Sequence, residues 1–363
     1  MAINRRNFVK AAAIGAVWGS HEWLPGIAQT GMSAPQDTDA LYDRSIVIDA
    51  LSIENWDDAG FAAAKQSGYT AIQTSLANRN MEAATRDLAA WKQRFEQNPD
   101  KLLHVTKAAQ IRQAKQEGKL GVVLGFQNAT CVESDLRNLD KLYEQGARCI
   151  QLTYNARNLL GDGCTERTNA GLSDFGVAVV ERMNQLGIIV DLSHCGEATS
   201  RDGIEFSKRP PAFTHTMCKA LYDHPRAKSD ALLRAMAEKG GMTGIVTLGY
   251  FVGPKPETNV EDYLNHLDHA VRVCGLDHVG LATDYQIRGI EACCTRENWY
   301  LPRLRIYKSS YNVRWPSWIP ELDKPDRFRV VARGLARRGY KSADIEKLLG
   351  GNWMRYFGEI FGG

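Results

Sequence analysis

Apolar, β-rich runs alternate with helical patterns along most of this chain. In the segment 173–186, apolar side chains recur at i, i+4, i+5 and i+8 from Phe175, and Ser173 stands before them as an N-cap. A strand followed by a helix, repeated eight times, is the pattern of an α/β fold of the (β/α)8 TIM-type barrel. The predicted strands are 46–50, 70–74, 121–125, 149–153, 188–192, 212–214, 244–248 and 279–282.

Polar side chains close several of these runs, and in such barrels the chemistry lies at the carboxyl ends of the strands. Neighbouring parallel strands lie about 4.8 Å apart, so side chains at one level can share an ion. The types present are metal ligands, proton carriers and hydrogen-bond donors, which predicts an active end here. The residues are Gln127, Tyr154, Asn155, His194, His215 and Asp284.

Two histidines, His194 and His215, end consecutive predicted strands. Imidazole is the commonest metal ligand in proteins, and this placement predicts that both bind one metal. His266 and His269 lie three apart on a predicted helix. Helices lie outside the barrel ring, so we expect this second pair at the surface. His224 lies in a polar loop and is expected at the surface or behind a site residue.

Composition excludes several classes of protein. A chain of 363 residues, 44% hydrophobic and 24% charged, is long enough for one large core. The net charge is +3, and Lys and Arg are scattered among Asp and Glu, which argues against a nucleic-acid partner. The eight cysteines show no C-x-x-C spacing, which argues against a zinc ribbon or a thioredoxin-type site.

The first segment has the pattern of an export signal. Arg5-Arg6-Asn7-Phe8-Val9-Lys10 matches the twin-arginine pattern, and the apolar stretch 11–18 is too short to span a bilayer. We expect residues 1–34 to be a twin-arginine signal peptide and leader, and the mature protein to be periplasmic, without an integral membrane span. Residues 35–363 are expected to form one domain.

Two further segments stand out within that domain. Residues 285–325 are rich in Arg, Trp, Tyr and Pro and lack periodicity, which predicts a long loop over the barrel mouth. Residues 343–361 predict a helical tail at the end of the chain.

Several motifs in order carry a resemblance to a known family. They include Leu152-Thr153-Tyr154-Asn155, Asp191-Leu192-Ser193-His194, Phe213-Thr214-His215-Thr216, His224-Pro225-Arg226, Gly280-Leu281-Ala282-Thr283-Asp284 and Gly351-Asn352-Trp353. Together they resemble the membrane (renal) dipeptidase family of zinc peptidases over about residues 44 to 361. The resemblance implies a (β/α)8 barrel with two zinc ions that hydrolyses dipeptides. Its members are often dimers, so a homodimer is expected.

The resemblance also implies roles for individual residues. His194 and His215 match the two histidines of one metal site, and Asp284 matches the carboxylate that handles the proton. Arg226 matches the residue that grips the terminal carboxylate of the substrate, because a guanidinium pairs with both carboxylate oxygens. We expect Asn155 to bind substrate together with Arg226.

Three departures from the family pattern change this expectation. The first-strand metal motif, His-x-Asp, falls on Leu51 and Ile53, which cannot bind a cation. The bridging glutamate falls on Gln127, and a substrate-contacting histidine falls on Tyr154. Two neighbouring zinc ions need anionic ligands to offset their repulsion, so we predict that a two-metal centre does not form.

A single zinc fits the remaining residues. His194, His215 and Asp284 make the two histidines and one carboxylate of a catalytic zinc that keeps one open position. If Asp284 is a ligand, Glu54, Asp57 or Tyr154 would have to carry the proton, and the residues leave this choice open. Gln127 is expected to hydrogen-bond a metal-bound water or a substrate carbonyl. The predicted catalytic residues are therefore Asp284, Tyr154 and Gln127.

Two functions follow from these patterns. The first is a metal-dependent hydrolase that cleaves the amide bond of a dipeptide or a similar small peptide-like molecule with one zinc. The second is a non-hydrolytic member of the fold, without metal, that acts as a periplasmic binding or maturation protein for such a molecule.

Overall fold

Nine parallel strands form the sheet in the computed structural model, which describes residues 37–362. The strands are β1 (Ile48–Asp49), β2 (Ala71–Ser75), β3 (Leu102–His104), β4 (Leu120–Phe126), β5 (Ala147–Gln151), β6 (Ile189–Asp191), β7 (Ala212–Thr216), β8 (Met242–Val246) and β9 (Val279–Ala282). Their order is β1-β2-β4-β5-β6-β7-β8-β9. The remaining strand, β3, lies outside this order and pairs with β4. Hydrogen bonds from Ala50 N to Leu281 O (3.2 Å) and from Asp284 N to Leu51 O (2.8 Å) join the two ends of the sheet.

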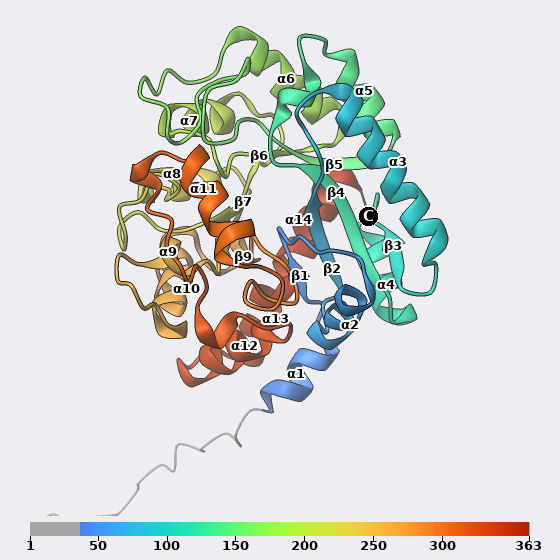
Figure 1. The fold of residues 1–363 in the computed structure, drawn as a ribbon, viewed down its shortest axis with the longest axis vertical. Coiled ribbons are helices and arrows are strands. Elements are labelled where there is room, and N and C mark those ends of the chain that lie inside the picture. The colour runs from blue at the N-terminus through green and yellow to red at the C-terminus, as the bar shows by residue number, and fades with distance from the viewer. Residues whose placement is uncertain (1–36, 363) are drawn as a thin grey trace, which may run out of the picture. The chain divides into compact units, whose positions relative to one another are not determined.

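The result is the predicted (β/α)8 barrel, with helices around the strands (Figure 1). Each of the eight predicted strands is present. The ninth, β3, was not predicted, because three residues are too short to show an alternating pattern. It lengthens the sheet outside the ring and leaves the barrel order unchanged.

Helices connect the strands on the outside of the barrel. Those up to β8 are α1 (Thr38–Arg44), α2 (Asp58–Ser67), α3 (Met81–Gln97), α4 (Ala109–Glu117), α5 (Arg137–Glu144), α6 (Asp174–Leu186), α7 (Glu197–Phe206) and α8 (Asp230–Glu238). Those after β8 are α9 (Gly249–Val252), α10 (Val260–Cys274), α11 (Leu301–Ile306), α12 (Arg327–Arg337), α13 (Ser342–Glu346) and α14 (Asn352–Phe361). The predicted N-cap of α6 is confirmed, since the Ser173 hydroxyl accepts a hydrogen bond from Gly176 N. No helix within residues 37–362 is both long and apolar enough to cross a membrane.

The C-terminal tail is helical, as predicted, and it closes the amino-terminal end of the barrel. Trp353 of α14 is fully buried and packs against Gly244 of β8 and Gly280 of β9, where a Cβ atom would collide with the indole ring. Figure 1 shows α14 at the centre, against the strands. With this end filled, the opposite end is left for chemistry.

At that opposite end, the segment between β9 and α12 covers the mouth, as the sequence predicted. It is not one irregular loop, because it contains a π-helical turn, Arg296–Tyr300, followed by α11. Its aromatic side chains pack with Tyr250 and Phe251 of α9 into a separate apolar cluster above the barrel. We call residues 296–318 the lid.

Candidate metal centre

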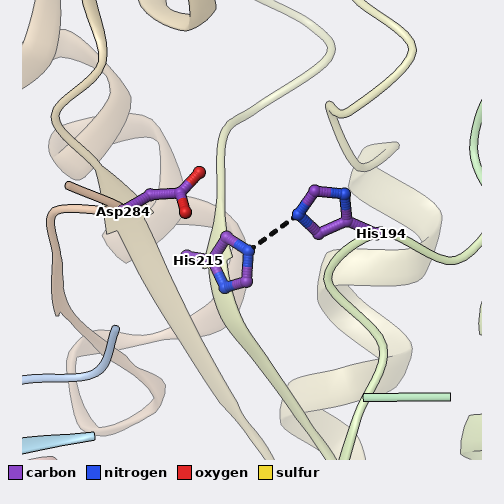
Figure 2. A group of neighbouring side chains, drawn as sticks. All are labelled: His194, His215 and Asp284. Atoms are coloured by element: carbon purple, nitrogen blue, oxygen red, sulfur yellow. Dashed lines mark hydrogen bonds between the residues drawn. The ribbon is translucent and has the colours of Figure 1, made fainter. Parts of the chain in front are cut away.

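Three side chains converge at the carboxyl ends of strands β6, β7 and β9. His194 follows β6, His215 lies in β7 and Asp284 follows β9. One ligand atom from each lies within 4.8 Å of the others. Figure 2 shows the two imidazole rings facing one another with the Asp284 carboxylate beside them. The structure thus brings together the three residues that the sequence predicted as one metal site.

The hydrogen bonds behind the rings fix the tautomer of both histidines. His194 Nδ1 lies 2.7 Å from Asn155 Oδ1, an acceptor, so this nitrogen carries the proton. The Thr214 hydroxyl donates to Asp191 at 2.7 Å, so it can only accept from His215 Nδ1, which lies 2.8 Å away. Each ring therefore presents an unprotonated Nε2.

These two Nε2 atoms lie only 3.0 Å apart. Two facing lone pairs at that distance repel each other unless a cation lies between them. Burial, together with the charge of Arg226, holds the pKa of both His194 and His215 well below its usual value, so a proton does not fill this role near neutral pH. Two nitrogens bound to one tetrahedral zinc lie about 3.3 Å apart, given Zn–N bonds of about 2.0 to 2.1 Å. The donor set therefore fits a divalent metal ion.

Asp284 supplies the negative charge of this cluster. Its backbone adopts a left-handed conformation with φ of 68°, which is costly for a residue other than glycine and is typical of functional sites. Burial raises the pKa of its carboxyl group to about 6, against the opposing charges of Arg226 and Arg303. The group is therefore ionised at neutral pH and available to a metal.

Gln127, just after β4, reaches the same cluster. Its Nε2 lies 3.3 Å from His215 Nε2 and 3.4 Å from Asp284 Oδ1. The amide N–H groups can donate to both acceptors in the metal-free protein, but with a metal on His215 Nε2 only the contact to Asp284 would remain, because that nitrogen has a single lone pair. Gln127 thus lies beside the metal ligands, as predicted, but it contributes no charge.

Tyr154 forms one wall of the site. Its ring stacks on His194 with 4.0 Å between ring centroids, and its hydroxyl lies 2.9 Å from the hydroxyl of Tyr307 in the lid. Burial raises the pKa of Tyr154 far above its usual value, so the phenol stays neutral. Tyr154 can therefore donate or accept a hydrogen bond but does not act as an anionic base.

Arg226 is buried beside the ligand strands rather than solvated in its loop. Its guanidinium donates to the carbonyl oxygens of Ser193 and, at 2.8 Å, of His215. It therefore braces both strand ends that carry the histidines. Among residues 37–362 its buried Nε–H has no hydrogen-bond partner, so this donor is available to a ligand. Asn155 holds His194 in place, and its buried Nδ2 likewise has no partner.

The β1 side of the mouth is different in character. Leu51 is fully buried, and Ile53 forms a bridge with Gln286. Glu54 pairs with Arg288 at 2.7 Å, and the side chain of Glu54 is 0% exposed. Asp57 caps α2 and pairs with the same arginine at 2.5 Å. Both carboxylates that the sequence left open as proton carriers are thus engaged in ion pairs, which disfavours that role.

Three histidines outside the cluster are buried. The expectation that His266 and His269 lie at the surface is wrong, because α10 turns them towards neighbouring elements. His266 Nε2 contacts Val252 O at 3.0 Å, and His269 pairs with Asp230 at 2.7 Å. His224 lies behind Arg226, whose backbone N–H donates to it at 3.1 Å.

Sequence reasoning missed two lid residues that reach the site, Tyr307 and Arg303. Neither lies on a periodic element or in a motif, so the sequence carries no signal for them. Tyr307 bonds Tyr154, and Arg303 lies one helical turn earlier. The lid thus contributes polar groups as well as cover.

Comparison with known proteins agrees with this geometry. The profile of the membrane dipeptidase family, peptidase family M19, matches residues 44–296. The chain belongs to the membrane dipeptidase family. This membership and the observed cluster make it a metal-dependent, dipeptidase-like hydrolase by family.

Solved structures of similar fold include three bacterial proteins. An amidohydrolase from Pseudomonas aeruginosa shares 29% identity, with a TM-score of 0.81 over 90% of this chain and 99% of that one. A protein described as a probable dipeptidase, also from Pseudomonas aeruginosa, shares 19% identity, with a TM-score of 0.73 over 89% and 97% of the two chains. A metallopeptidase from Rhodobacter sphaeroides, bound to a phosphinate mimic of the dipeptide L-Ala-D-Ala, shares 19% identity, with a TM-score of 0.72 over 87% and 99%.

Proposed function

We propose that this member of the dipeptidase family is a one-zinc hydrolase that cleaves the amide bond of a dipeptide or a similar small peptide-like molecule. The observation that carries the proposal is the pair of unprotonated Nε2 atoms 3.0 Å apart beside one carboxylate. Two histidines and a carboxylate are the ligand set of many catalytic zinc sites.

The chain's own residues have distinct tasks in this scheme. A bound zinc lowers the pKa of water and polarises a carbonyl group. Asn155 and the Thr214 hydroxyl keep His194 and His215 in the ligand tautomer. Gln127 offers an amide hydrogen to Asp284 Oδ1. Because Glu54 and Asp57 are held in ion pairs with Arg288, we assign one carboxylate oxygen of Asp284 to ligation and the other to the acceptance of a proton.

Substrate binding falls to the surrounding groups. The unpaired Nε–H of Arg226 supports its role as an anchor for a terminal carboxylate. Tyr154 and Tyr307 together form a wall that limits the access of water. Holding the substrate in one orientation with these groups would contribute several orders of magnitude in rate.

One experiment tests the proposal directly. The protein is matured through its own export route, its metal content is measured, and L,L and L,D dipeptides are screened for hydrolysis. We expect about one equivalent of zinc and hydrolysis that a chelator abolishes. A metal-free protein that hydrolyses no dipeptide would instead favour the non-hydrolytic binding or maturation protein.

Export to the periplasm and assembly into a homodimer are part of the same proposal. The twin-arginine pattern lies at residues 5 and 6, outside the described residues. Replacing both arginines by lysine is expected to retain the protein in the cytoplasm, as cell fractionation would show. Sedimentation of the mature protein measures the oligomeric state.

A further inference from the structure

Positive charge dominates the surroundings of the metal centre. Arg226 and Lys228 are buried beside the strands that carry the histidines: the Arg226 guanidinium donates to His215 O at 2.8 Å, and Lys228 Nζ donates to Cys195 O at 2.7 Å. Arg303 approaches from the lid, one helical turn before Tyr307, whose hydroxyl lies 2.9 Å from that of Tyr154. The metal ligands themselves include one carboxylate, Asp284. A metal ion adds two further positive charges, so a ligand with more than one negative group is favoured here.

Arg303 is held in a fixed orientation by the lid. Its guanidinium stacks on the Trp299 ring at 3.7 Å from the centroid, and its Nη1 donates to Trp299 O at 2.8 Å. Trp299 is 4% exposed and packs against Tyr250, so the platform under the guanidinium is rigid. Stacking on an aromatic face leaves the edge of the guanidinium free to pair with a carboxylate.

The lid also places Arg303 near the reacting groups. Tyr307 lies one turn further along, and its hydroxyl bonds Tyr154, which stacks on His194. Within the described residues, the side chain of Arg303 makes one hydrogen bond, to Trp299 O, and no ion pair. The other donors of its guanidinium therefore remain available to a bound molecule.

We propose that Arg303 is a specificity-determining residue that binds a second carboxylate of the substrate. The preferred substrates are then acidic dipeptides, in which Arg226 meets the terminal carboxylate and Arg303 meets the side chain of an Asp or Glu residue. This inference rests on the proposed function, because it assumes that the mouth binds a peptide-like molecule.

Matched pairs of dipeptides test the proposal: Ala-Glu against Ala-Gln, and Glu-Ala against Gln-Ala. We expect the zinc-loaded native protein to favour the acidic member of at least one pair by about tenfold in kcat/KM, as for a charge-assisted bidentate contact. Arg303→Gln is expected to lose this preference, because its kcat/KM falls far more for the acidic member than for the neutral member of the pair. Arg305→Gln, on the exposed side of α11, is the matched control and should keep the preference.

Calorimetric binding of the same pairs separates this inference from the proposed function. If no dipeptide is hydrolysed, the proposed function fails, whereas tighter binding of the acidic member that depends on Arg303 still supports the inference. Equal treatment of both members by the native protein, in hydrolysis and in binding, would overturn it. So would an equal loss for both members in Arg303→Gln, because that result is expected if Arg303 only holds the lid in place.

Discussion

The two halves of the barrel mouth carry different kinds of side chain. We call the ends of β6, β7 and β9 the ligand half and the end of β1 the β1 half. Strands β6, β7 and β9 end in His194, His215 and Asp284, whose donor atoms point at one another. Strand β1, next to β9, is followed by Leu51, which is buried and apolar, and by Glu54, whose charge is neutralised by Arg288. One half presents free ligand atoms to the mouth, and the other presents none.

In the one-zinc proposal, the β1 side gives up the metal position of the family pattern without loss of the fold. The backbone still joins β1 to β9 through the bonds from Asp284 N and Thr283 N to Leu51 O. Those bonds do not depend on the side chain at Leu51. An apolar side chain and an internal ion pair can therefore fill the space of a metal site while the barrel stays closed.

Removing one histidine is expected to have the largest effect, a loss of zinc binding by the ligand half. In His215→Ala, we expect zinc affinity to fall by more than about a hundredfold, because losing even a group behind a ligand typically costs about tenfold to a hundredfold. Metal titration with a competing chelator measures the loss. The matched variant His278→Gln, remote from the cluster, should bind zinc like the native protein; equal affinity of His215→Ala and the native protein would contradict the assigned site.

Removing Arg288 is expected to destabilise the β1 half. Arg288→Met leaves the Glu54 carboxylate buried without its partner, so the free energy of unfolding should fall by about 3 kcal/mol or more. Urea denaturation measures the change. The control is Arg86→Met, whose pair with Glu82 is 61% and 79% exposed and is worth about 1 kcal/mol at most. A loss no larger than that of the control would show that the pair does not hold this half together.

Gln127 lies between the halves, and adding a charge there tests how far metal binding depends on the number of carboxylates. Gln127→Glu places a negative charge where the amide now lies 3.3 Å from His215 Nε2 and 3.4 Å from Asp284 Oδ1. We expect zinc affinity to rise about tenfold, since the added carboxylate is a direct ligand candidate. The exposed Gln145→Glu controls for the change in net charge. Equal zinc affinity of Gln127→Glu and the native protein, titrated with a competing chelator, would count against the one-zinc proposal.

The smallest expected effect is a pH dependence of the ligand half. The pKa of Asp284 rises from 3.8 to about 6 on folding, so the metal-free folded state binds more protons than the unfolded state between these values. Its free energy of unfolding therefore falls as pH rises through this window. Asp284→Asn should show a shallower fall than the native protein when both are unfolded in urea from pH 4 to pH 7. Parallel curves would show that Asp284 titrates normally.

Much of the site was predictable from strand ends alone. His194, His215 and Asp284 each close an apolar run, and parallel strands bring such positions to one level. Gln127 and Tyr154 were found in the same way, and both lie at the cluster. The sequence leaves Glu54 and Asp57 open as proton carriers. Their ion-pair partner, Arg288, lies 231 to 234 residues away, and no local pattern indicates such a distant contact.

The misjudged residues share one cause. His266 and His269 were assigned to the surface because helices lie outside the ring, but a helix buries the face that it turns to its neighbours. The burial of Arg226 is likewise invisible in its polar loop sequence, although its predicted role in binding a carboxylate is not contradicted; it is fully buried with its charge against main-chain carbonyls. Local sequence reports the polarity of a segment and not the direction in which each side chain points.

The sequence by itself determined the barrel, the end of it that gathers polar side chains and the three candidate ligand residues, because these follow from periodicity and the geometry of parallel strands. The tertiary structure decided the tautomers of both histidines, the ion pair that occupies Glu54 and the approach of Arg303 from the lid. Each of these depends on contacts between residues distant in the chain, whose relative positions are set only when the whole core packs.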